Sequence, residues 1–288
     1  MGSSASSKIR AVRRRHCINL KRTRLTTRFD NPEWHAALAG LIRTGDDQQT
    51  AAALAKAIGT AVDHDATCLL AFYRDAPPNV LHHTMTPGRA RHYLDRYLAG
   101  PYLLDPLYQL AVRKKKATMC RCRDEMPDRF RSSEYFRQYY ERTHLVDEMD
   151  FFLDADANST LVLVVGRWEA RFTRSDVSHL NRMEPIVRAS MQRIWDAWSA
   201  RHSHDDRNLN MHQRLTQCFE QFGESSLTKR ERQITQLLLR GHSSKSVARE
   251  LGIAPGTVMV HKRNLFSKLG ITSQYELFSL FIDRLSML

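Results

Sequence analysis

The sequence is poor in features that mark several common protein classes. Five cysteines and 12 glycines occur among 288 residues, and no apolar run approaches the roughly 18 residues that a membrane-spanning helix needs. The cysteines are odd in number and scattered, which indicates reduced thiols in a cytosolic protein rather than a disulfide framework. No apolar block follows the basic N-terminus, so we expect no secretory signal. These absences predict a cytoplasmic protein that does not associate with a membrane.

Motifs for catalysis and for cofactor binding are absent as well. Neither GxxxxGK[ST] nor GxGxxG occurs, so the sequence predicts no cradle for nucleotide phosphates. No Ser/His/Asp arrangement stands out. Cys120 and Cys122 are separated by one residue and have no histidine pair nearby, which argues against a zinc site and leaves redox sensing open. We therefore expect no enzyme activity, no cofactor and no metal ion.

The positive charge is concentrated at the two ends of the chain. The net charge is +13, of which residues 1–29 carry +9 without a single acid and residues 227–288 carry +6, so that 30–226 is close to neutral. A basic module with a folding pattern indicates a polyanion partner, most often nucleic acid. The N-terminal run has no periodicity and is predicted to be a disordered arm, which either adds phosphate contacts or is a solvated tail.

The region 30–200 combines strand and helix patterns. Strands are expected at 67–73, 79–85, 146–153 and 160–168, and helices at 32–42, 46–62, 88–98, 105–115, 133–142 and 175–198. The first helix has an apolar stripe of Trp34, Leu38 and Ile42, and Pro185 predicts a kink or a break in the last one. A short turn before residue 160 predicts an antiparallel hairpin. The fold class is therefore α+β, with an N-terminal antiparallel-sheet α/β/α sandwich of the sensor type.

An acidic face is expected on one of these strands. Residues 146–153 alternate imperfectly, with Met149, Phe151 and Leu153 on one side and Glu148, Asp150 and the following Asp154 on the other, where Phe152 interrupts the polar residues. This pattern predicts a half-buried strand with a solvated acidic side. A catalytic pair of carboxylates would need a fixed separation, which the sequence does not reveal.

The C-terminal region, residues 227–288, has the clearest helix punctuation. Capping boxes open the first and fourth helices at Thr228-x-x-Glu231 and Ser273-x-x-Glu276, Ser243 or Ser244 opens the second, Pro255 opens the third, and Gly241, Gly252 and Gly270 end the first three. The result is an all-α four-helix unit with tight turns. A short connection between its second and third helices matches a helix-turn-helix for DNA binding. The alternative is a small helical bundle that binds protein.

The third helix of this unit has one polar and one apolar side. Thr257, His261, Asn264 and Lys268 recur at spacings of three and four residues, so they share one face. Val258, Leu265 and Leu269 lie toward the core. A helix of this kind suits the major groove, where polar side chains reach base edges and phosphates.

This C-terminal region resembles the LuxR-type helix-turn-helix family. The matching stretches are LTKRE at 227–231, GHSSKSVA at 241–248, LGI at 251–253, GTVMVHKRN at 256–264 and KLG at 268–270. The resemblance implies a homodimeric transcription factor that binds double-stranded DNA. The DNA-binding residues are expected to be Ser244, Lys245, Thr257, Val258, Met259, His261, Lys262, Asn264 and Lys268. Met259 stands where the family usually has lysine, so the family's operator preference does not carry over.

The larger domain resembles autoinducer-binding domains of the acyl-homoserine-lactone type. The residues that support this resemblance are Tyr93-x-x-x-Tyr97 and the Asp105-Pro106 pair. The resemblance implies that Tyr97 bonds a ligand carbonyl and Asp105 a ligand amide, with Tyr93 in the same site. The match departs from the family, because Tyr93 stands where tryptophan is usual and the spacing to Asp105 differs by one. The competing interpretation is helix packing for the tyrosines and a helix cap for Asp105.

The sequence predicts a two-domain regulator of transcription. We expect a basic arm at 1–29, a sensor domain at 30–200, a linker with a connecting helix at 201–226 and the DNA-binding domain at 227–288. A small effector such as an acyl-homoserine lactone would control it. Alternatively, the N-terminal domain only dimerises or binds a partner protein, or is an enzyme joined to a DNA-binding module.

Overall fold

The computed structural model of this chain describes residues 28–112, 118–202 and 206–286. The predicted basic arm at 1–29 lies almost wholly outside these residues. Five strands form one antiparallel sheet in the order β2-β1-β5-β4-β3. The strands are β1 (Ala66–Tyr73), β2 (Asn79–His83), β3 (Met119–Arg121), β4 (Asp147–Asp154) and β5 (Ser159–Arg167).

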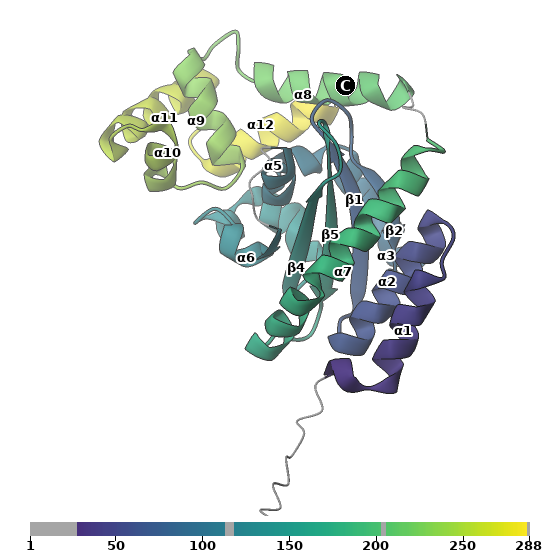
Figure 1. Cartoon of the computed structure of the whole chain (residues 1–288). Coiled ribbons are helices and arrows are strands. Elements are labelled where there is room, and N and C mark those ends of the chain that lie inside the picture. The colour runs from purple at the N-terminus through teal and green to yellow at the C-terminus, as the bar shows by residue number, and fades with distance from the viewer. Residues whose placement is uncertain (1–27, 113–117, 203–205, 287–288) are drawn as a thin grey trace, which may run out of the picture.

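Helices cover both faces of this sheet and continue into a separate group at one end (Figure 1). The α-helices are α1 (Pro32–Ile42), α2 (Asp47–Ala61), α3 (Pro87–Ala90), α4 (Arg96–Leu98), α5 (Pro106–Val112), α6 (Cys122–Glu125), α7 (Arg174–Ser199), α8 (Asp206–Gln221), α9 (Lys229–Leu239), α10 (Ser244–Leu251), α11 (Pro255–Leu269) and α12 (Gln274–Ser286). Two π-helical turns, Arg91–Asp95 and Phe136–Tyr140, and four 3-10 turns, Arg28–Asp30, Pro101–Leu104, Phe130–Ser132 and Glu141–Thr143, complete the description. Within the described ranges, no helix is long and apolar enough to cross a membrane.

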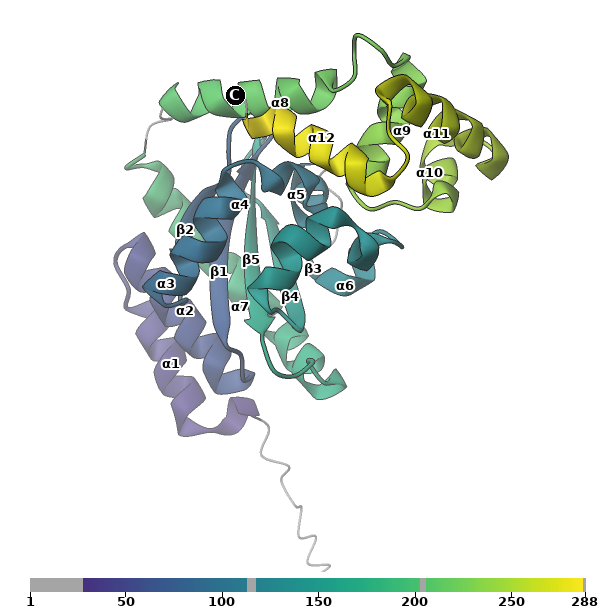
Figure 2. The same ribbon diagram turned by 180° about the vertical axis from the view of Figure 1, so that it is seen from behind.

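The two faces of the sheet belong to two different cores. Leu69, Phe151 and Leu163 face α1, α2 and α7, whereas Leu70 and Phe72 face the layer of α3 to α6. Figure 2 shows this second layer from its own side. Alternate side chains of β1 therefore enter opposite cores, which explains why every residue of β1 is buried, as its unbroken apolar run predicts. The expected α/β/α sandwich on an antiparallel sheet is confirmed.

Three features of this domain differ in detail from what the sequence predicts. Of the kink or break predicted at Pro185, the break does not occur, because α7 continues through this exposed proline. The side chain of Ile42, expected on an apolar stripe, is 74% exposed at the end of α1. The three-residue strand β3 was not expected, since a strand so short has no detectable alternation.

The acidic side of β4 is also not what the alternation predicts. Glu148 and Asp150 are 4% and 0% exposed, so the strand is buried on both faces and has no solvated side along most of its length. The segment β3–α6 and the π-helical turn Phe136–Tyr140 cover this side. The expectation fails because alternation shows which residues share a face but not which other elements cover that face.

The four C-terminal helices α9 to α12 follow the predicted punctuation closely. The Thr228 capping box is complete, Ser243 rather than Ser244 caps α10, and Pro255 occupies the first turn of α11. Gly252 and Gly270 have φ values of 62° and 67°, in the left-handed region that favours glycine. The apolar sides of the four helices meet around Ile234, Val247, Val258, Leu265 and Leu277. These contacts confirm the all-α four-helix unit.

Candidate functional site

A cavity lies between the sheet and the layer of α3 to α6. Its volume is about 160 Å³, and its walls include Leu70, Phe72 and Val164 from the sheet. The two π-helical turns Arg91–Asp95 and Phe136–Tyr140 form much of the opposite wall. Insertions of this kind in helices occur frequently at functional sites. A single water needs about 10–15 Å³ of such space, so the cavity has room for a small organic molecule.

The structure brings all three predicted ligand-binding residues to this cavity. Tyr93, Tyr97 and Asp105 line it together. The hydroxyl of Tyr97 donates to a carboxylate oxygen of Asp105 at 2.7 Å, and the other carboxylate oxygen accepts from the backbone N–H of Leu107 at 2.9 Å. Asp105 therefore caps the turn into α5, as the packing interpretation predicts, and also lines the cavity, where ligand binding stays a prediction.

Sequence reasoning missed several polar groups of the cavity. Glu148 of β4 lines it, and its carboxylate accepts a hydrogen bond from the hydroxyl of Tyr140 at 2.8 Å. Tyr135 and Trp168 also line it, and the guanidinium of Arg89 lies over the Trp168 ring at 4.1 Å. The available signal for Glu148 is the group of acids within β4, a pattern that on its own favours a solvated face.

Burial dominates the electrostatics of the cavity. It raises the pKa of Asp105 to about 6, although hydrogen bonds from Tyr97 and Leu107 oppose the shift. Burial also raises the pKa of Glu148, against hydrogen bonds from Cys122 and Tyr140. Burial and the nearby Asp105 carboxylate raise the pKa of Tyr97. The inner wall of the cavity thus offers hydroxyl and carboxyl groups that can each donate or accept a hydrogen bond.

The predicted DNA interface lies on α10 and α11. Thr257, Met259 and Asn264 are exposed along α11, and His261 and Lys262 are half-buried. The ammonium of Lys262 lies 5.2 Å from the centre of the Phe266 ring. At the start of α10, Lys245 is exposed and Ser244 is half-buried. These seven side chains are all at least partly open to a ligand outside the module.

Two residues of the predicted DNA-binding set have contacts within the module. Val258 is completely buried in the core of the four-helix unit, so it does not face a base edge. The ammonium of Lys268 donates to the carboxylate of Glu231 at 2.8 Å. Glu231 is itself 3% exposed and also accepts from the backbone N–H of Thr228 at 2.8 Å. Lys268 therefore joins α11 to the start of α9 as a structural ion pair.

The N-terminal domain contacts the start of α10. The backbone N–H of Ser243 donates to a carboxylate oxygen of Asp128 at 3.0 Å, and the Ser243 hydroxyl donates to the other oxygen. The backbone N–H of Arg129 donates to the carbonyl oxygen of Gly241 at 3.2 Å. A Cβ atom at Gly241 would lie 3.1 Å from the Cα atom of Phe130, so this approach requires glycine. An acidic side chain thus occupies the helix start where a phosphate would bind.

Comparison with known proteins agrees with both parts of this architecture. The family described as bacterial regulatory proteins, luxR family, matches residues 225–281. The chain is 31% identical over 157 residues to a protein of Aeromonas salmonicida named as an HTH-type transcriptional regulator in the exeN 3′ region, covering 53% of this chain and 80% of that protein. It is 48% identical over 54 residues to the transcriptional regulatory protein UhpA of Escherichia coli, covering 19% of this chain and 28% of UhpA.

A solved structure resembles the N-terminal domain. The crystal structure of the LBD domain of VqsR from Pseudomonas aeruginosa aligns with a TM-score of 0.51 and 25% identity, over 57% of this chain and 97% of that chain. The Aeromonas protein is matched over most of its length, and the luxR-family match coincides with the four-helix unit that the capping pattern defines. This chain therefore belongs to the LuxR family of bacterial transcriptional regulators.

Proposed function

We propose that the N-terminal domain of this regulator binds a small organic ligand in the cavity and thereby controls DNA binding by α10 and α11. The observation that carries the proposal is the cavity, where an apolar wall from the sheet faces a few polar groups at fixed positions. Small-molecule sites in proteins have this composition. The ligand class is a largely apolar molecule with a hydrogen-bonding head group, which includes acyl-homoserine lactones.

The DNA interface consists of the open side chains on α10 and α11. Lys245 and Lys262 contact phosphates, and Thr257, His261 and Asn264 face the major groove. The exposed Met259 makes apolar contact there. The regulator acts as a homodimer, so that two recognition helices read two half-sites. Exposed apolar side chains of α12, Tyr275 and Leu280, support a contact through the fourth helix.

The contact between the two domains supplies a physical basis for control. Asp128 holds the N–H and the hydroxyl of Ser243, at a helix start that phosphate needs. DNA and the N-terminal domain therefore compete for one group. A ligand that binds more tightly to one of the two arrangements shifts the balance between them by its difference in affinity.

The ligand proposal is tested with the full chain and a series of acyl-homoserine lactones of graded length. A binder raises the melting temperature in a concentration-dependent manner. Tyr97→Phe removes a hydroxyl at the inner wall and is expected to weaken binding about tenfold, the loss of one hydrogen bond of roughly 1–1.5 kcal/mol. Tyr275→Phe removes an exposed hydroxyl outside the cavity and serves as the matched control.

The second candidate function is ligand-independent regulation, in which the N-terminal domain binds a partner protein or only dimerises. The domain contact at Asp128 favours it, because this contact joins the two domains through groups of the chain itself. If neither lactones nor other apolar metabolites of this size raise the melting temperature, the second candidate replaces the first. If a ligand binds Tyr97→Phe as it binds the wild type, the Tyr97 hydroxyl is not part of the ligand site.

A further inference from the structure

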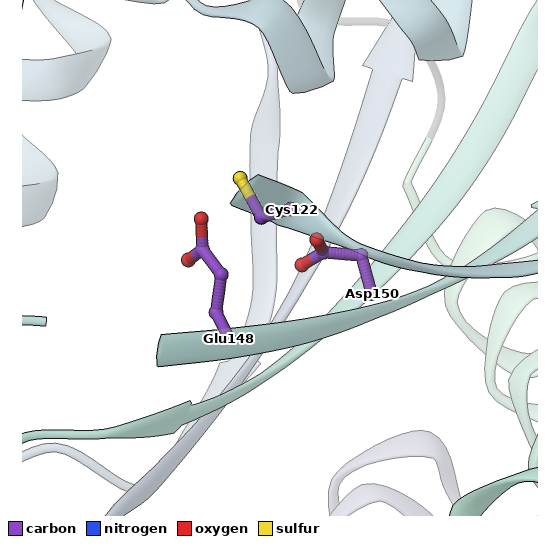
Figure 3. Close-up of side chains that lie close together, drawn as sticks. All are labelled: Cys122, Glu148 and Asp150. Atoms are coloured by element: carbon purple, nitrogen blue, oxygen red, sulfur yellow. The ribbon is translucent and has the colours of Figure 1, made fainter. Parts of the chain in front are cut away.

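Three side chains of types that can ligate a metal ion lie close together inside the N-terminal domain. A thiol sulfur of Cys122 and carboxylate oxygens of Glu148 and Asp150 all lie within 4.8 Å of one another. Figure 3 shows the two carboxylates standing on the same side of β4, with the Cys122 sulfur reaching toward them from the neighbouring segment. The three residues are 1%, 4% and 0% exposed, so the cluster is closed to bulk water.

Asp150 gives an independent indication that something is bound at this cluster. Both of its carboxylate oxygens are buried and have no hydrogen-bond partner among the described residues. Leaving a buried polar group unpaired costs free energy, and for a charge the cost is larger still. Native proteins seldom tolerate such a group without an ion, a water or a functional reason.

No basic side chain compensates these acids in the part of the chain that the structure describes. The nearest ion pair joins Arg121 to Asp147, and its acid lies on the opposite face of β4, where it also accepts from the backbone N–H of Phe172. From outside the cluster, the hydroxyl of Tyr140 donates a hydrogen bond to the Glu148 carboxylate at 2.8 Å, and this donor is uncharged. A cation would therefore neutralise groups that have no other charged partner in these ranges.

The donor set indicates which cation fits. Thiolate ligands select soft or borderline ions such as Zn²⁺, whereas magnesium and calcium prefer oxygen ligands alone. Two carboxylates and one thiolate supply three protein ligands, which is the number found in zinc sites that keep a fourth position for water or another small ligand. The sequence does not reveal this set, because α6 and β4, which carry it, are separated along the chain and no histidine marks it.

We propose that Cys122, Glu148 and Asp150 form a binding site for a divalent metal ion of the Zn²⁺ class. The site goes beyond ligand control by the cavity and does not depend on it. On binding, the thiol and any protonated carboxyl release their protons to solvent, and the metal takes their place. Glu148 belongs to both sites, so the metal would join β3–α6 and β4 directly behind the cavity wall.

The test uses the full chain without an affinity tag, stripped with a chelator and dialysed against Zn²⁺ or Co²⁺. We expect stoichiometric zinc by mass spectrometry, and with cobalt the charge-transfer absorption of a thiolate-bound ion. Zinc should also raise the melting temperature. Cys122→Ser and Asp150→Asn should each weaken zinc binding by more than about 100-fold, since even outer-sphere partners of a metal site change affinity by 10–100-fold.

Cys218→Ser is the matched control, because it removes another buried thiol outside the cluster and should leave zinc binding and the cobalt band unchanged. If Asp150→Asn does not fold, Glu148→Gln takes its place. A wild-type chain that retains neither ion overturns the proposal, as do Cys122→Ser and Asp150→Asn chains that bind zinc with wild-type affinity. If the wild-type chain takes up no metal and Asp150→Asn raises its stability, Glu148 and Asp150 form a protonated pair of acids instead of a metal site.

Discussion

The carboxylate of Glu231 links Thr228 and Lys268, which lie far apart in the sequence of the DNA-binding module. It accepts hydrogen bonds from the backbone and hydroxyl of Thr228 and from the ammonium of Lys268. Thr228 in turn caps α9, and Lys268 lies near the end of α11. One buried acid therefore fixes the start of α9 against the end of α11.

Replacement of Glu231 by glutamine should destabilise this module. Hydrogen bonds to charged groups contribute about 1.5–3 kcal/mol, so we expect Glu231→Gln to lower the free energy of unfolding by about 1–3 kcal/mol near neutral pH. Urea denaturation of the full chain, followed by circular dichroism, measures the change. Glu250→Gln on the exposed side of α10 is the matched control and should have little effect.

The destabilisation caused by Glu231→Gln should also depend on pH. Burial tends to raise the pKa of Glu231, but hydrogen bonds from Lys268 and Thr228 outweigh it and hold this pKa below its usual value. A carboxyl of this kind stabilises the folded state above its unfolded pKa, about 4.3, and the stabilisation is lost as pH falls through the lower folded pKa. The stability gap between wild type and Glu231→Gln should narrow in this acid range, and a gap that stays constant would contradict the assignment.

At the scale of single residues, the sequence indicates the local partners better than the distant ones. The capping pair Thr228 and Glu231 could be predicted, because three residues separate its members. The polar helical face that carries Lys268 predicts a contact with DNA. Its ion pair with Glu231 is not apparent from the sequence, because Glu231 lies 37 residues away. Glu148 was missed for a similar reason, because only the fold places another layer over its strand.

At the scale of elements, the segment 128–130 joins the N-terminal domain to the start of α10 through hydrogen bonds. Burial tends to raise the pKa of Asp128, yet hydrogen bonds from Ser243 and the charge of His242 hold this pKa below its usual value. Asp128 is therefore ionised near neutral pH and opposes phosphate at the same helix start. In the proposed competition, the strength of this contact determines how much of the regulator is open to DNA.

Asp128→Ala should increase the affinity for DNA. Loss of one exposed contact worth roughly 0.5–1.5 kcal/mol predicts a gain of about two- to tenfold, because the N-terminal domain then competes less with phosphate. Fluorescence anisotropy with a fixed duplex at constant salt measures it. Asp124→Ala removes the same charge from a neighbouring exposed position. Equal gains in DNA affinity in both variants would show a general effect of charge and would contradict a competition between Asp128 and phosphate.

Element boundaries also show where periodicity is informative. The strands β1, β2, β4 and β5 and the helices α9 to α12 were expected, because long apolar patterns and helix caps mark them. The strand β3 pairs through only three residues, Met119–Arg121, and its register with Phe151 to Met149 depends on a partner near residue 150. Such an element is defined by its neighbour and not by its own sequence.

At the scale of the whole molecule, charge separates the two ends of the chain from its centre. Residues 227–288 carry a net charge of +6 around the predicted DNA interface, whereas 30–226 is close to neutral. Phosphate contacts release counterions, so the logarithm of the DNA affinity falls linearly with the logarithm of the salt concentration. The slope of that line counts the contacts and therefore tests which lysines face the duplex.

His261→Ala combined with Lys262→Ala should weaken DNA binding and reduce the salt slope by about one for each phosphate contact that is lost. Lys56→Ala removes an exposed lysine from α2 in the N-terminal domain and should leave the slope unchanged, because α2 is not part of the proposed DNA interface. The measurement is a titration of a fixed duplex at several salt concentrations. If the double variant keeps the wild-type slope, this side of α11 does not face phosphate, and the position of the recognition helix on DNA must be different.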